Sequence, residues 1–271
     1  MDEKCTVMLS RLKMFMAFIM LVLFLMAWFR LDSNPNIDSP LIWQAQIAAF
    51  QEEDRKRPPK IGSVLFVGSS SIRLWRTLAE DFVPLSVIKR GFGGATLNDV
   101  IYYAEEVIFS YQPQAVVLYV GSNDIKSPSP KSPTEVLHLT KQLVEKIHKR
   151  LPLVPVFFIA INPTPKRWHL WPVIQQANKL IKMYADKQPN VIFIDSAGLF
   201  LDKKQSLRYS LFKKDQLHLN QAGYAQWLRV IKPVLMKHLK NEPAQSSSHI
   251  FRDKFLVCES HWVSFSGFWT H

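Results

Sequence analysis

The chain has 271 residues and a formal net charge of +12 at pH 7, which allows one sizeable domain with extensions. Its lysines and arginines are scattered, and no basic stripe carries interleaved aromatic residues, so a solvated basic surface is favoured over nucleic-acid binding. The two cysteines, Cys5 and Cys258, have no metal-ligand spacing and indicate no disulfide framework.

The first apolar segment is residues 14–29, which contain no charged residue. As a helix it would span about 24 Å, slightly less than a hydrocarbon core of about 30 Å. We therefore expect residues 1–30 to be an uncleaved signal anchor, a transmembrane helix that holds the protein at the membrane. Lys4, Arg11 and Lys13 favour a cytoplasmic N-terminus, which would place the catalytic domain outside the cytoplasm, in the periplasm if the source is bacterial. A cleaved secretion signal and a buried helix of a soluble protein are the alternatives.

Strands and helices alternate along the central part of the chain. Residues 31–40 are polar, carry two prolines and predict a linker. Apolar runs then predict five strands, at 64–67, 85–88, 115–120, 154–161 and 191–194. Helices are predicted at 41–56, 74–81, 96–110, from Thr134, at 173–187 and from Asn220 or Gln221, the last interrupted near Pro233.

Strands separated by helices predict a mainly parallel sheet that is covered on both faces. We assign this α/β domain to residues 41–240. Residues 241–271 differ from it, because a serine-rich break is followed by an aromatic stretch without clear periodicity, and their role is unknown.

Four short polar stretches follow the predicted strands or precede the last helix. They are residues 68–71 (GSSS), 90–96 (RGFGGAT), 121–124 (GSND) and 215–220 (DQLHLN). Each stretch alone is typical of a turn, a helix cap or a packed histidine. Because loops at the carboxyl ends of parallel strands share one rim, we expect the four stretches to meet.

These residue types together match the requirements of acyl transfer. A serine hydroxyl needs a base, usually histidine, to remove its proton, and a carboxylate holds the imidazole in the required tautomer. The developing oxyanion needs donors that already point at it, such as backbone N–H groups beside a glycine and a side-chain amide. The joint occurrence of these groups favours catalysis over four unrelated turns.

The four stretches resemble, in this order, the four blocks of the SGNH subgroup of GDSL-type hydrolases, over roughly residues 41–239. The resemblance implies a flavodoxin-like three-layer α/β/α sandwich with a mainly parallel five-stranded sheet, and an esterase, lipase or acylhydrolase activity without metal or cofactor. It implies Ser70 as nucleophile, His218 as base and Asp215 as the partner of His218. The implied oxyanion hole consists of the Ser70 and Gly94 N–H groups and the Asn123 side chain.

The sequence departs from this family pattern at two positions. The usual Gly-Asp-Ser is replaced by Gly68-Ser69-Ser70, and Lys89 stands where an asparagine often precedes the second block. Ser70 is the predicted nucleophile because it lies two residues after Gly68, while Ser69 and Ser71 are alternatives.

The segment after the fourth strand contributes further candidates. Asn162, Arg167, Trp168 and Trp171 are predicted to contact substrate, and packing of the tryptophans against the domain is the alternative. Asp195 also ends a strand, but Asp215 is the preferred partner of His218 because it is close in sequence.

The sequence therefore predicts a membrane-anchored serine ester hydrolase. Its substrate would be the acyl ester of a small molecule, a lipid or an acylated saccharide. Two alternatives remain open: acyl transfer to a sugar hydroxyl by the same site, and a non-catalytic, membrane-tethered carbohydrate-binding or scaffold protein with this fold.

Overall fold

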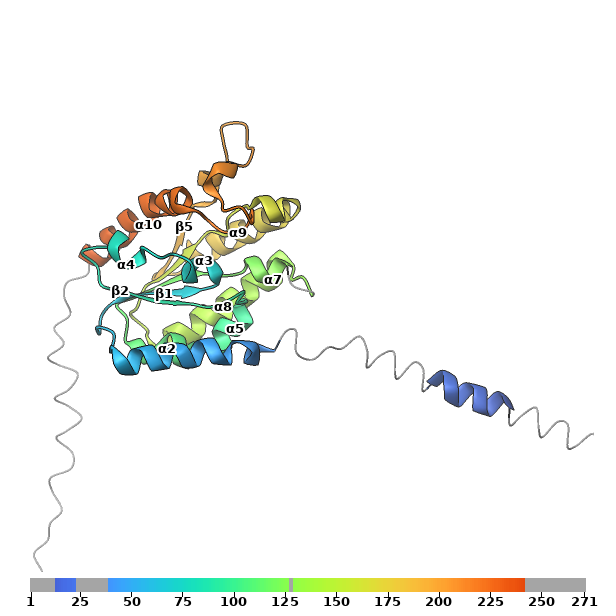
Figure 1. Ribbon diagram of the computed structural model, residues 1–271. Coiled ribbons are helices and arrows are strands. Elements are labelled where there is room, and N and C mark those ends of the chain that lie inside the picture. Colours follow the sequence, from blue (N-terminus) through green and yellow to red (C-terminus); the bar gives the residue numbers. More distant parts are fainter. Residues whose placement is uncertain (1–12, 23–38, 127–128, 242–271) are drawn as a thin grey trace, which may run out of the picture.

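The computed structural model describes residues 13–22, 39–126 and 129–241. A parallel five-stranded sheet forms the centre of the domain, with the strand order β2-β1-β3-β4-β5 (Figure 1). The strands are β1 (Val64–Gly68), β2 (Val87–Gly91), β3 (Ala115–Tyr119), β4 (Val156–Ile159) and β5 (Val191–Ile194). The residues of β1, β3 and β4 are all buried, as expected for apolar strands covered on both faces.

Helices cover both faces of the sheet, each over its own apolar core cluster. One face carries α2 (Gln44–Lys56), α5 (Leu97–Tyr102), α6 (Ala104–Val107), α8 (Pro133–Arg150) and α9 (Trp171–Ala185). The other carries α3 (Ser70–Arg73), α4 (Leu78–Asp81) and α10 (Gln221–Asn241). This arrangement confirms the predicted three-layer α/β/α fold.

Shorter segments complete the domain at its edges. The helix α7 (Ser122–Lys126) follows β3 directly. The 3₁₀ turns in the described part of the chain are η1 (Pro40–Trp43), η2 (Phe109–Tyr111), η3 (Pro165–Leu170), η4 (Ala197–Phe200) and η5 (Tyr209–Leu211).

The strand order places a topological switch between β1 and β3. From β1 the chain moves outward to β2 and then returns across the sheet to β3 on the other side of β1. Connections that leave neighbouring strands in opposite directions open a crevice at the strands' carboxyl ends, where α/β proteins bind ligands. The register pairs Gly68 with both Gly91 and Tyr119, so β1, β2 and β3 end at the same level.

The predicted helix at 74–81 is confirmed only over the single-turn helix α4, because the chain before Leu78 forms an irregular turn. Trp75 lies in that turn, buried against Phe82 and Trp227, and its indole N–H donates to Asp81 Oδ2 over 2.6 Å. Burying one such side chain stabilises the fold by roughly 1.5–3 kcal/mol, which exceeds the differences in helix propensity among most residues.

The last helix is continuous, which corrects the predicted interruption at Pro233. Trp227, Ile231 and Leu235 form its fully buried stripe against the sheet. This packing keeps the segment helical on both sides of the proline, although proline removes one backbone hydrogen bond. The predicted helix at 96–110 is also corrected, because it divides into α5, α6 and η2.

Several boundaries differ by a few residues from those predicted. The second strand begins at Val87, so Arg90 and Gly91 belong to β2 and not to the loop after it. The helix α8 begins at Pro133, where Ser132 and Glu135 form a capping box that satisfies the first backbone N–H groups.

Residues 13–22 form a helix. Among the described helices, none combines the length and apolar character that a membrane span requires. The other residues of the predicted anchor, the predicted linker up to residue 38 and the tail from residue 242 lie outside the described residues.

Candidate active site

The serine turn depends on two glycines that leave room for neighbouring backbone. Gly68 ends β1 with a φ of +146°, and a Cβ there would lie 2.0 Å from the carbonyl oxygen of Tyr119. A Cβ on Gly91 would lie 2.4 Å from the backbone nitrogen of Arg73 in α3. These contacts allow α3 to start directly at the sheet edge, with Ser70 as its first residue.

A continuous hydrogen-bond chain joins the serine turn to the loop before α10. Ser70 Oγ lies 3.0 Å from His218 Nε2, and His218 Nδ1 lies 2.7 Å from Asp215 Oδ2. The structure thus brings together the predicted nucleophile, base and carboxylate.

The other carboxylate oxygen of Asp215 holds the backbone of the same loop. Asp215 Oδ1 accepts hydrogen bonds from the backbone N–H groups of Leu217 and His218, each at 3.0 Å. Burial alone would raise the pKa of Asp215, but these hydrogen bonds and the His218 ring outweigh it and lower the pKa to about 2. The Asp215 carboxylate is therefore ionised at neutral pH and can pair with a protonated imidazole.

Two of the predicted oxyanion donors, Gly94 and Asn123, lie next to each other. Asn123, in α7, donates from Nδ2 to the carbonyl oxygen of Ala95 over 3.0 Å, and a Cβ on Gly94 would lie 3.9 Å from that nitrogen. Within the described residues, the backbone N–H groups of Ser70 and Gly94 donate to no protein acceptor. These two N–H groups are thus available to a substrate oxygen.

The glycine loop is held in place by η1 and α2. Gly93 donates its backbone N–H to Gln46 Oε1 over 3.0 Å, and the ring of Trp43 occupies the space that a Gly93 Cβ would fill. Arg90 fixes α2 to β2 through ion pairs with Glu53 and Asp54. The N-terminal helix of the domain thereby shapes the loop that carries Gly94.

Asp124 is a structural residue of the site that sequence reasoning missed. Its carboxylate is fully buried and accepts the Leu97 N–H at 3.0 and 3.2 Å, so it joins α7 to the start of α5. Burial raises the pKa of Asp124 to about 6, against the Leu97 hydrogen bonds and the Lys131 charge, which lower it. Its position directly after Asn123 could have indicated a role in the site, but an aspartate at such a position is also typical of a turn.

Arg167 contacts the donor loop. Its guanidinium donates to the carbonyl oxygen and Oγ of Ser122, at 3.1 and 2.6 Å, and to Oδ1 of Asn123, at 3.0 Å. Arg167 thus makes three hydrogen bonds within the protein, and its predicted contact with substrate stays a prediction.

Asn162 is predicted to line the site, and its contact with substrate stays a prediction. Its side chain is buried on the α10 side, within hydrogen-bonding distance of Ser196 and the Trp227 indole. Trp168 and Trp171 stack on each other with ring centroids 6.3 Å apart, and Trp168 is 38% exposed. A contact of these tryptophans with substrate stays a prediction.

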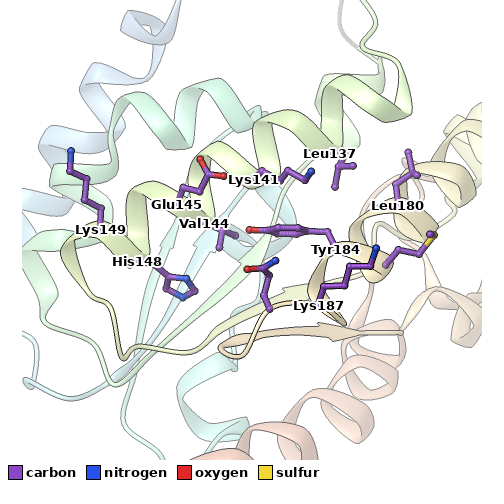
Figure 2. A pocket seen from close by; sticks show the side chains of 11 residues that line it. Leu137, Lys141, Val144, Glu145, His148, Lys149, Leu180, Tyr184 and Lys187 are labelled. Carbon is purple, nitrogen blue, oxygen red and sulfur yellow. The ribbon is translucent and has the colours of Figure 1, made fainter.

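A separate groove of about 710 Å³ lies between α8 and α9 (Figure 2). Leu137, Val144 and Tyr184 contribute to its lining, together with lysines such as Lys141 and Lys187. None of the predicted catalytic residues belongs to this groove. In the part of the chain that the structure describes, no group of three or more His, Cys, Asp or Glu residues is placed to hold a metal ion.

The raised pKa of Asp124 predicts a specific pH dependence of stability. From the ordinary value of 3.8 up to about 6, the native state retains a proton that the unfolded chain has released. The free energy of unfolding therefore falls as the pH rises through this window. Relative to Asp124→Asn, which cannot titrate, the native protein should lose about 2 kcal/mol between roughly pH 4.5 and 7.5. Urea unfolding of both proteins measures this difference. If the free energies of unfolding of the two proteins changed in parallel with pH, the raised pKa of the buried Asp124 would be contradicted.

Comparisons with known proteins agree with this geometry. The model of the GDSL-like lipase/acylhydrolase family matches residues 66–226, which include both Ser70 and His218. The platelet-activating factor acetylhydrolase IB subunit alpha2 of Homo sapiens is 26% identical over 238 residues, covering 81% of this chain and 98% of that protein. The alpha1 subunit of Pongo abelii is 24% identical over 215 residues, covering 76% and 87%.

Two solved structures share the fold. A GDSL-like lipase from Bacteroides thetaiotaomicron has a TM-score of 0.60 and 20% identity, covering 72% of this chain and 98% of that one. A catalytic mutant of an acetylxylan esterase from Geobacillus stearothermophilus has a TM-score of 0.52 and 20% identity, covering 63% and 94%. With the family match across the site, these findings show that the chain belongs to the GDSL-like lipase/acylhydrolase family and is a carboxylic ester hydrolase.

Proposed function

We propose that the protein hydrolyses acyl esters with Ser70 as nucleophile, His218 as general base and Asp215 as the residue that orients the imidazole. The observation that carries this proposal is the hydrogen-bond chain from Ser70 Oγ through both ring nitrogens of His218 to Asp215. A serine hydroxyl is a weak nucleophile on its own, and a histidine within hydrogen-bond distance supplies the missing base.

The first half of the reaction acylates the serine. Ser70 Oγ attacks the ester carbonyl carbon while its proton passes to His218 Nε2. The carbonyl oxygen becomes an oxyanion held by the free N–H groups of Ser70 and Gly94 and by the Asn123 amide. His218 then gives the proton to the departing alcohol, which leaves an acyl-enzyme.

The second half regenerates the enzyme. A water molecule attacks the acyl carbon and passes a proton to His218, and the acid departs as Ser70 recovers its proton. Asp215, with a pKa of about 2, remains ionised throughout and stabilises the imidazolium that forms in each half. Loss of one oxyanion donor would cost about 3–4 kcal/mol of transition-state stabilisation.

We infer a short acyl group, such as acetate, as the preferred substrate moiety. Support comes from the relatives, because a platelet-activating factor acetylhydrolase subunit and an acetylxylan esterase are both named for the removal of acetyl groups. These two names differ in the acetylated compound, which is platelet-activating factor in one and xylan in the other, so the inference concerns the acyl side of the ester.

Replacement of Ser70 by alanine should abolish turnover, because it removes the attacking oxygen and leaves only the oxyanion donors. With p-nitrophenyl acetate we expect kcat to fall at least about 10³-fold. Ser71→Ala is the matched control, since Ser71 is the next residue of α3 and its backbone carbonyl, which accepts the Tyr224 hydroxyl at 2.8 Å, is retained. Full activity of Ser70→Ala would exclude Ser70 as the nucleophile, whereas Ser71→Ala should keep its activity.

We also propose that the N-terminal segment anchors this domain to a membrane, with the domain outside the cytoplasm. Support comes from the sequence, where residues 14–29 are uncharged and follow three basic residues. A reporter enzyme that works only outside the cytoplasm, fused after residue 240, should be active, and the protein should sediment with membranes. Recovery of the full-length protein in the soluble cytoplasmic fraction would refute the anchor.

A further inference from the structure

Arg167 is a cation that contacts the predicted oxyanion donor Asn123, and it forms no ion pair with a carboxylate of the described residues. It belongs to η3, and burial lowers the pKa of its guanidinium from the ordinary value. None of the ion pairs in residues 13–22, 39–126 and 129–241 includes it. Taking a cation out of water without a counter-charge costs free energy, so we expect Arg167 to have a role in structure or catalysis.

The contacts of Arg167 converge on the loop that carries Asn123. Nη1 donates twice to Ser122 and Nη2 donates to Asn123 Oδ1 at 3.0 Å. An arginine side chain has only hydrogen-bond donors, so it can bond to the oxygen of an amide but not to its NH₂ group. Asn123 Oδ1 is thereby held toward Arg167, which leaves Nδ2 on the side of Ala95 and Gly94.

This orientation matters because the two edges of an amide have opposite effects on an oxyanion. If the Asn123 amide rotated by half a turn, its oxygen would take the place of the donor and would repel the developing negative charge. The guanidinium charge also polarises the amide, which makes Nδ2–H a stronger donor. In a partly buried site, a positive charge behind the donor adds to the stabilisation of the oxyanion.

The same segment is tied to the histidine loop. The backbone N–H of Lys166 donates to the carbonyl oxygen of Gln216 over 2.9 Å, and Gln216 lies between Asp215 and His218. The 3₁₀ turn that carries Arg167 therefore contacts both the donor loop and the base loop. This one short segment therefore helps to position both the loop that carries Asn123 and the loop that carries His218.

We propose that Arg167 is a positioning residue of the oxyanion hole that acts through Asn123. The proposal rests on the proposed function, because it needs Asn123 to serve as an oxyanion donor. A lysine could not reproduce it fully, since an ammonium is a point charge without the planar fork that reaches Ser122 and Asn123 together.

A double-mutant cycle tests this dependence with four full-length proteins: the native enzyme, Arg167→Gln, Asn123→Ala and the double variant. With p-nitrophenyl acetate, Asn123→Ala should lower kcat about 10²–10³-fold and Arg167→Gln about 10–100-fold, each with KM changed less than about threefold. Because Arg167 acts through Asn123, the double variant should equal Asn123→Ala within about threefold.

Two further variants separate positioning from folding. Arg208→Gln is the matched control, since Arg208 is also half-buried and donates to a backbone carbonyl, that of Leu199, over 2.8 Å; its kcat should stay within about twofold. Arg167→Lys keeps the charge and should lose about tenfold in kcat, with no further loss when Asn123→Ala is added. This second cycle decides the matter if Arg167→Gln does not fold, as judged by its thermal unfolding.

Losses that multiply in the double variant would overturn the proposal, because Arg167 would then act independently of Asn123. A raised KM with unchanged kcat in Arg167→Gln would overturn it in favour of substrate binding, and unchanged kcat in Asn123→Ala would also overturn it. Activity retained by Ser70→Ala would instead refute the proposed function. With Ser70→Ala inactive, multiplied losses in the cycle refute only the role of Arg167.

Discussion

The close approach of three backbones at the carboxyl end of the sheet is the constraint on which the site depends. Gly68 leaves room for the carbonyl of Tyr119, and Gly91 leaves room for the start of α3. Any side chain at either position would have to displace backbone, which is much stiffer than a side chain. The position of the serine turn, and with it Ser70, is therefore set by strand packing.

Charge distribution explains how the loops around that turn keep their places. The buried Asp124 accepts from the Leu97 N–H, Arg167 donates to Asn123, and Asp215 contacts the His218 ring. Each charge fixes a backbone or amide group by hydrogen bonds that are stronger than those between neutral groups. The donors for the oxyanion are thus oriented in advance, which is the condition under which they lower a reaction barrier most.

The fold and the central residues of the site were predictable because their signals are local. Apolar runs followed by glycine or serine identified the strand ends. Because loops at the carboxyl ends of parallel strands share one edge of the sheet, Ser70, Asn123 and His218 could be predicted to lie in one site. The contact between Arg167 and Asn123 joins positions 44 residues apart and leaves no pattern in the sequence. Trp75 and Pro233 misled local rules because tertiary packing outweighed helix propensity: Trp75 is itself buried, and the helix around the exposed Pro233 is held by its buried neighbours Ile231 and Leu235.

The most direct measurement is mass spectrometry of the full-length protein after reaction with a fluorophosphonate, which forms a stable bond with an activated serine. The proposed mechanism predicts one adduct, located on Ser70, and a labelling rate that falls at least about 10²-fold in His218→Ala because the base is lost. An adduct on Ser69 or Ser71, or an unchanged labelling rate without His218, would contradict the assignment of Ser70 and His218 as nucleophile and base.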